Sequence, residues 1–138
     1  MDNVFESLGR LLVGELGFGR PRTQFGLTDG RREVWCDLRI GRHIFELDGR
    51  IKYRPQADGG VATVSPEQVL WDEKQRQDFI CSFKLGVSRI VWADLWGPAR
   101  ARARDRLARE LLDTYARFGD SIADLEPFII RRPRRRRP

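Results

Sequence analysis

The chain has 138 residues, enough for one domain with its own hydrophobic core but too few for two large ones. Its 26 basic and 20 acidic residues give a formal net charge of +6, and six arginines lie among the last eight residues, where there is no acid. Without these six the charges balance, so the body is neutral and the excess positive charge belongs to the C-terminal end.

A structural zinc site is almost excluded, because the chain has one histidine and two cysteines far apart in the sequence. Cys36 and Cys81 fall in segments that we interpret as a buried strand and a buried helix face, so we expect reduced thiols that act as small apolar side chains. No apolar run approaches membrane-spanning length, and the N-terminus lacks a signal-peptide pattern. We therefore expect a soluble, cytoplasmic protein that does not contact membranes.

Apolar side chains at helical spacing predict a first helix over residues 4–16, which ends before the break at Gly19-Arg20-Pro21. A short strand is predicted over 24–27. Residues 34–40 and 43–48 then alternate apolar and polar side chains, which predicts two strands joined by a tight turn at Gly41-Arg42.

A second helix is predicted after Ser65, which is followed by Pro66 at the first helical position and by Gln68 in a capping box. Residues 72–78 in its middle are polar on all sides, so part of this stretch must face water, a cleft or a ligand. A strand over 87–92 and a last helix over about 100–118 follow.

This order of elements predicts the α/β class, with a mixed sheet flanked by helices. We divide the chain into a core, a C-terminal helix packed on that core, and a basic, disordered tail, over residues 1–97, 98–126 and 127–138.

Two carboxylates on the return strand, Glu46 and Asp48, are two residues apart and therefore project from the same face of the sheet. Crowded carboxylates repel each other and are costly to desolvate, so such a group usually binds a cation. Together with Asp37 they form a set that can hold one or two Mg²⁺ ions, or Mn²⁺ in their place. The alternative is that Asp37 pairs with Arg39 or Arg50 on an exposed strand face, while Asp48 merely starts a turn.

Three motifs in this part of the chain carry a likeness to a known family. They are Glu-x-Asp-Gly-Arg-x-Lys-Tyr over 46–53, Glu-Lys-x-Arg over 73–76 and Gly-x-x-x-x-x-Trp-x-Asp-Leu over 86–95. The pattern resembles the very-short-patch-repair-like endonuclease domains of the PD-(D/E)xK nuclease superfamily, and the resemblance covers about residues 4–96. It implies a restriction-endonuclease-like core and a metal-dependent phosphodiesterase.

The resemblance also implies roles for individual acids. Asp37 and Glu46 correspond to the strand acids that bind metal, and Glu6 corresponds to the acid of the first helix, although a glutamate on a helix is usually only solvated. The superfamily's lysine, two residues after the second acid, is here Asp48. Because that lysine normally orients or activates the attacking water, its replacement matters, but the related subgroup lacks it too.

Lys52 is our best candidate for the electrostatic role of the missing lysine, and Lys74 is the reserve. The alternative for Lys52 is an ordinary exposed loop lysine. His43 is interpreted as a residue at the edge of the hairpin rather than as a metal ligand.

Several basic residues are candidates for contacts with nucleic-acid phosphates. Lys74 and Arg76 are expected at the mouth of the site together with Arg50, although Lys74 with Asp78 and Asp72 with Arg76 are also ordinary helix pairs four residues apart. The arginines of the tail either contact the phosphate backbone without sequence specificity or contribute solubility. They are Arg131, Arg132, Arg134, Arg135, Arg136 and Arg137.

The function expected from these residues is Mg²⁺-dependent endonucleolytic hydrolysis of DNA, and RNA is not excluded as a substrate. The alternative is a catalytically inactive nuclease-fold module that binds DNA or a protein partner, in a toxin–antitoxin or phage context. The last helix, through Leu107, Leu111 and Tyr115, either pairs two copies in a homodimer or covers the sheet of one copy.

Overall fold

A computed structural model of the chain describes residues 3–49 and 65–134. The longer helices in these ranges are α1 (Val4–Gly14), α2 (Pro66–Cys81) and α3 (Gly97–Phe118). The strands are β1 (Phe25–Thr28), β2 (Glu33–Cys36), β3 (Leu38–Ile40), β4 (His43–Asp48) and β5 (Gly86–Val91). Two 3₁₀ helices, η3 (Trp92–Leu95) and η4 (Ala123–Phe128), follow β5 and α3 respectively.

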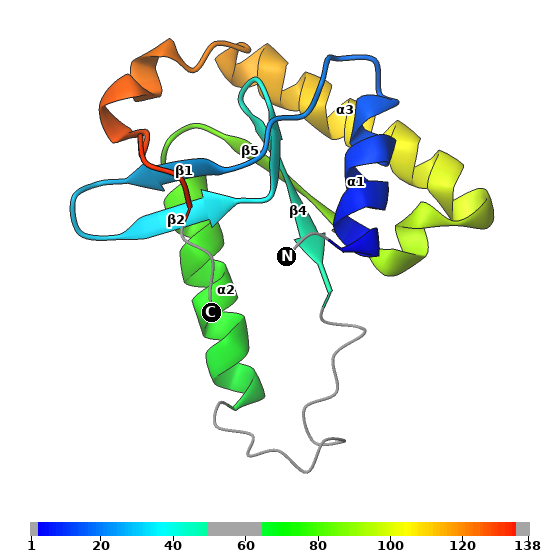
Figure 1. The fold of residues 1–138 in the computed structure, drawn as a ribbon, viewed down its shortest axis with the longest axis horizontal. Helices are drawn as coiled ribbons and strands as arrows, with labels where there is room; N and C mark the ends of the chain where they lie inside the picture. The colour runs from blue at the N-terminus through cyan, green and yellow to red at the C-terminus, as the bar shows by residue number, and fades with distance from the viewer. Residues whose placement is uncertain (1–2, 50–64, 135–138) are drawn as a thin grey trace.

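The central sheet has the order β3-β4-β5, with β3 antiparallel and β5 parallel to β4. A second, two-stranded antiparallel sheet is formed by β1 and β2. The prediction of an α/β fold with a mixed sheet flanked by helices is therefore confirmed (Figure 1). The structure differs in one detail, because the predicted strand over 34–40 is broken at Asp37 into β2 and β3, which belong to different sheets.

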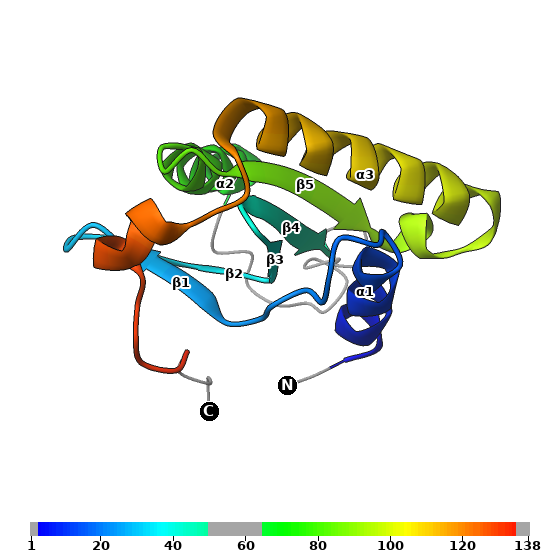
Figure 2. The same cartoon turned by 90° about the horizontal axis from the view of Figure 1, so that it is seen from above.

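Successive residues of β4 point to opposite faces of the central sheet and pack into two separate cores. Phe45 packs with α1, α3 and η3, whereas Ile44 packs with the β1–β2 hairpin, α2 and η4. Figure 2 shows α3 running along one side of β4 and β5. The central sheet is thus covered on both faces, so the polar side chains of β4 lie in buried or half-buried surroundings.

Helix α2 begins where its sequence predicts, and the hydroxyl of Ser65 accepts a hydrogen bond of 3.1 Å from the backbone N–H of Gln68. Only this half of the predicted capping box is observed in the described residues, since the side-chain amide of Gln68 donates to Asp72 Oδ1 at 2.8 Å. Its first turns extend beyond the sheet, as Figure 1 shows. Leu70 and Trp71 there are 62% and 57% exposed. Cys81 at the other end is exposed, so the prediction of a buried Cys81 is wrong, while Cys36 is buried as expected.

The last helix covers the sheet of one copy, since Leu107 and Leu111 are fully buried against the core that contains Phe45. These two side chains are consequently not available to pair two copies. No helix in the described ranges has the length and apolar character needed to cross a bilayer.

The C-terminal segment is attached to the body beyond the point where we expected a tail. Ile129 forms a β-bridge with Leu27, and the backbone N–H of Ile130 donates to the carbonyl of Gly26 at 2.9 Å. The prediction of disorder is therefore wrong for residues 127–130, because the backbone of this stretch bonds to β1 and Ile129 packs against the core that contains Ile44.

Candidate active site

Two acids, Asp37 at the break between β2 and β3 and Glu46 on β4, are held together by hydrogen bonds. The backbone N–H of Leu47 donates to Asp37 Oδ2 at 2.8 Å, and the backbone N–H of Asp37 donates to Glu46 Oε2 at 3.2 Å. The hairpin register, which pairs Leu38 with Phe45, places residue 37 opposite residue 46. The side chains of Asp37 and Glu46 thus take over the hydrogen bonds that a continuous strand ladder would otherwise have made there.

The charge of Glu46 is compensated by an arginine of α2. Arg76 Nη1 donates to Glu46 Oε1, and Arg76 Nη2 donates to the carbonyl oxygen of Trp35. Glu46 is only 6% exposed. Burial, and next the charge of Asp37, raise the pKa of Glu46, whereas Arg76 acts in the opposite direction.

The pKa of Arg76 is itself raised. Burial alone would lower it, but the charge and hydrogen bond of Glu46, assisted by Cys36 and Asp37, outweigh that effect. Each partner therefore favours the charged form of the other. The prediction that Arg76 lies at the site is consistent with this contact, although its guanidinium is directed at a carboxylate of the protein itself.

Asp48 has a second arginine for a neighbour. Arg89 Nη1 of β5 lies 3.7 Å from Asp48 Oδ2, and Arg89 Nη2 donates to Glu73 and, at 3.2 Å, to Gln77 Oε1 of α2. Strand register places Arg89 beside Glu46. We call Asp37, Glu46, Asp48 and Glu73, with Arg76 and Arg89, the carboxylate–arginine cluster. Its four acids and two arginines leave a net charge of −2 when all are ionised.

The sequence patterns do not identify Arg89 as a site residue, and they include Glu73 only as the first residue of the Glu-Lys-x-Arg motif. An arginine between the apolar residues of a buried strand was the available signal, because such a residue needs a carboxylate partner. Its partners could not be identified, since they depend on how α2 crosses the sheet.

The other predicted site residues lie in different surroundings. Lys74 pairs with Asp78 at 3.4 Å on the exposed side of α2, as in the helix-pair alternative. Glu6 is half-buried in the first turn of α1. Arg50 and Lys52 lie outside the described residues.

Two arginines of the C-terminal end contact acids of the body. Arg131 pairs with Glu126, and Arg132 pairs with Glu33 at the start of β2. Arg134 is exposed, and Arg135, Arg136 and Arg137 are outside the described residues. The predicted phosphate contacts of this segment stay predictions.

His43 is a buried core residue rather than a residue at the hairpin edge. It is 1% exposed, with Nδ1 2.8 Å from Thr114 Oγ1 and Nε2 2.7 Å from Ser88 Oγ. Burial lowers the pKa of His43 to about 4, and only the charge of Asp113 opposes this. The imidazole is consequently neutral at pH 7 and points away from the acids, on the face of β4 that carries Phe45.

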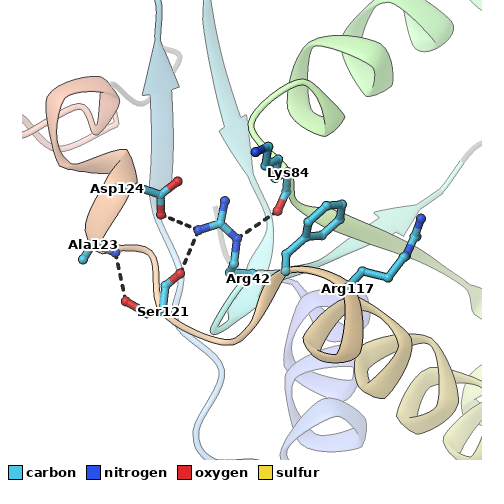
Figure 3. A pocket seen from close by; sticks show the side chains of 7 residues that line it. Arg42, Lys84, Arg117, Ser121, Ala123 and Asp124 are labelled. Carbon is cyan, nitrogen blue, oxygen red and sulfur yellow. Dashed lines mark hydrogen bonds and ion pairs between the residues drawn. The ribbon is translucent and has the colours of Figure 1, made fainter.

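A pocket of about 450 Å³ lies at the opposite end of β4 from the acids (Figure 3). Arg42, which lines it, donates to the carbonyls of Lys84 and Ser121 at 2.9 and 2.7 Å, to the carbonyl of Phe83 and to Asp124. Because these bonds occupy both terminal nitrogens and Nε, Arg42 joins the end of α2 to η4 and is not directed at a ligand.

The acids of the cluster could bind Mg²⁺ through only one or two carboxylates. Within residues 3–49 and 65–134, no group of three or more His, Cys, Asp and Glu side chains is arranged to hold a metal ion. Mg²⁺ is, however, commonly bound by one or two carboxylates, with water and phosphate oxygens completing its shell. Asp37 Oδ1 accepts no hydrogen bond from the described residues, whereas both carboxylate oxygens of Glu46 accept one, from Arg76 and from the backbone of Asp37. Asp37 therefore has an oxygen available for a cation, and Glu46 would have to share one of its oxygens with these donors.

A scan against protein-family models and searches of the curated proteins and of the solved structures each found no match.

Proposed function

We propose that the protein is a metal-dependent endonuclease with a restriction-endonuclease-like core, acting on DNA phosphodiester bonds. The observation that supports this most is the pairing of Asp37 with Glu46 across the β3–β4 hairpin, in which backbone N–H groups fix both carboxylates. Two acids crowded at the break between two sheets cost free energy unless a cation or a substrate uses them.

In this proposal Asp37 and Glu46 hold Mg²⁺, and Asp48 supports them. When bound, the ion lowers the pKa of a coordinated water and neutralises charge on the scissile phosphate. Arg76 fixes the orientation of Glu46, and Arg89 restrains Asp48. Lys52 remains the candidate for the role of the lysine that Asp48 replaces.

A second function has its own supporting observation. Arg76 and Arg89 already neutralise Glu46 and Asp48, and neither acid needs a cation while these contacts persist. A catalytically inactive module that binds DNA or a protein partner is therefore the alternative.

The test is cleavage of supercoiled plasmid and of labelled single-stranded DNA and RNA, with Mg²⁺, Mn²⁺ or EDTA. The informative variant is Glu46→Gln. Its control is Glu67→Gln, which replaces an exposed acid in the first turn of α2, the helix that carries Arg76. We expect metal-dependent nicking by the wild type and by Glu67→Gln, and none by Glu46→Gln. DNA binding without cleavage under any metal would favour the inactive module instead.

A further inference from the structure

Two arginines face each other at the outer edge of the central sheet. Residue 22 forms an isolated antiparallel bridge with residue 39 of β3, in which Arg22 N–H donates to the Arg39 carbonyl at 2.8 Å and the reverse bond measures 2.9 Å. Side chains of residues directly opposite in such a bridge lie on the same face, only about 5 Å apart at their Cβ atoms. Like charges in this position destabilise a sheet.

No acid compensates this pair in the described part of the chain. Arg39 Nη1 donates to the carbonyl of Gly41 at 2.9 Å, and the Arg39 guanidinium lies 4.6 Å from the centroid of the Phe25 ring. Arg39 Nε is buried and has no hydrogen-bond partner among the described residues. Arg22 is exposed and forms no ion pair with them.

Four other partly or fully buried arginines on this sheet and its covering elements each have an acid, although the guanidinium of Arg32 in the β1–β2 turn contacts, among the described residues, only the Gln75 carbonyl and the Phe79 ring. A carboxylate contacts Arg42, Arg76, Arg89 and Arg106. Burial, and next the charge of Arg22, lower the pKa of Arg39, so its charged form is held at a cost. Two neighbouring cations without a carboxylate favour a bound anion, and the exposed side chain of Arg22 is open to it, whereas the enclosed Nε of Arg39 is not.

The position of the pair relates it to the acids. Arg39 is paired with Ile44 of β4, so it shares the sheet face from which Glu46 and Asp48 also project. Arg39 follows Asp37 by two residues, which places its Cα about 7 Å further along the chain. A nucleic-acid strand with one phosphate at Asp37 would therefore bring another phosphate towards the two guanidiniums.

We propose that Arg22 and Arg39 form a phosphate-binding site for the backbone of the nucleic acid, next to the phosphate that is cleaved. The identification of the ligand as a nucleic acid rests on the proposed nuclease function. The expectation that the two arginines bind an anion does not. Two guanidiniums supply charge-assisted donors to phosphate oxygens, and the bound charge removes their mutual repulsion. Such a contact positions the strand and carries no sequence information.

The test compares Arg22→Gln and Arg39→Met with Arg102→Gln, which removes an exposed arginine on α3. Fluorescence anisotropy with a labelled duplex in EDTA, over a series of salt concentrations, gives the affinity and its salt dependence. We expect each variant of the pair to bind roughly tenfold more weakly. The slope of log K against log salt should fall by about 0.9 for each phosphate that a variant no longer neutralises.

Thermal stability distinguishes a phosphate site from a purely structural role of the pair. If the two arginines only stabilised the fold, replacing Arg22 would lower the melting temperature. Arg22→Glu supplies the acid that Arg39 lacks, so we expect its melting temperature to rise while its DNA affinity falls. Inorganic phosphate should raise the melting temperature of the wild type and of Arg102→Gln, but not that of Arg22→Glu.

The outcomes separate this inference from the nuclease proposal. If the wild type cleaves DNA and the pair variants retain its affinity and salt slope, the phosphate site is refuted and the nuclease stands. If phosphate stabilises the wild type through the pair but no metal supports cleavage, the phosphate site stands and the nuclease is refuted.

Discussion

Lowering the pH should destabilise the protein through His43 in particular. The folded chain holds this imidazole neutral with a pKa of about 4, against an ordinary value of 6.5. Between these two values the unfolded chain binds a proton that the folded chain does not, so stability is complete above about pH 6.5 and is lost as the pH falls towards 4. A difference of roughly 2.5 pH units corresponds to about 3 kcal/mol, a substantial part of the 5–15 kcal/mol that is typical of a domain.

The assay is urea unfolding at half-unit steps from pH 4.5 to 7.5, for the wild type and for His43→Gln. Carboxylates titrate in both proteins, including Glu46, whose raised pKa acts in the opposite sense. The difference between the two proteins therefore isolates the imidazole. We expect this difference to change by up to about 1.4 kcal/mol per pH unit below pH 6 and to be constant above pH 7.

NMR gives an independent measurement, because His43 is the only histidine in the chain and its ring signals need no assignment. Parallel stability curves for the two proteins, or an imidazole that titrates near pH 6.5 in the folded state, would refute this reasoning. Either result would mean that Ser88 and Thr114 do not enclose the ring as described.

Two further substitutions test the packing around the sites. Arg76→Met leaves the buried carboxylate of Glu46 without its partner, so we expect the free energy of unfolding in urea to fall by about 3 kcal/mol. The double variant Arg76→Met/Glu46→Gln should recover most of this loss. A loss that persists in the double variant would instead show that Arg76 acts through packing alone. Gly86→Ala places a Cβ against Thr114 Oγ1, closer than van der Waals contact allows, so its free energy of unfolding should fall by about 3 kcal/mol. The control is Gly14→Ala in α1, which should be neutral or stabilising because its Cβ would meet only Pro21, at 3.9 Å. Equal effects at both glycines would contradict the close approach of α3 to β5.

Local patterns predicted the parts of the fold that depend on neighbouring residues. The alternation around Gly41-Arg42 predicted the β3–β4 hairpin, and the Ser65 cap predicted the start of α2. The proximity of Asp37 and Glu46 also follows from a hairpin register, which is a local property.

Contacts between elements distant in sequence could not be predicted in the same way. Arg76 had an equally good helix partner in Asp72, and only the packing of α2 on the sheet directs it to Glu46. The burial of His43 depends on Ser88 and Thr114, which lie 45 and 71 residues away. Asp37 divides a strand that reads as continuous, because its side-chain hydrogen bonds replace those of the ladder.

The separation of these contacts along the chain has a consequence for the order of folding. Asp37 and Glu46 are nine residues apart and meet as soon as the β3–β4 hairpin forms, whereas Arg76 is thirty residues from Glu46. Arg76 contacts Glu46 only when α2 packs on the sheet, which closes a longer loop of the chain. Closing a longer loop costs more conformational entropy and is therefore slower. We therefore expect the two acids to come together before Arg76 reaches them, and Arg76 to stabilise the native state more than the transition state. In stopped-flow experiments, Arg76→Met should accelerate unfolding while leaving the refolding rate nearly unchanged.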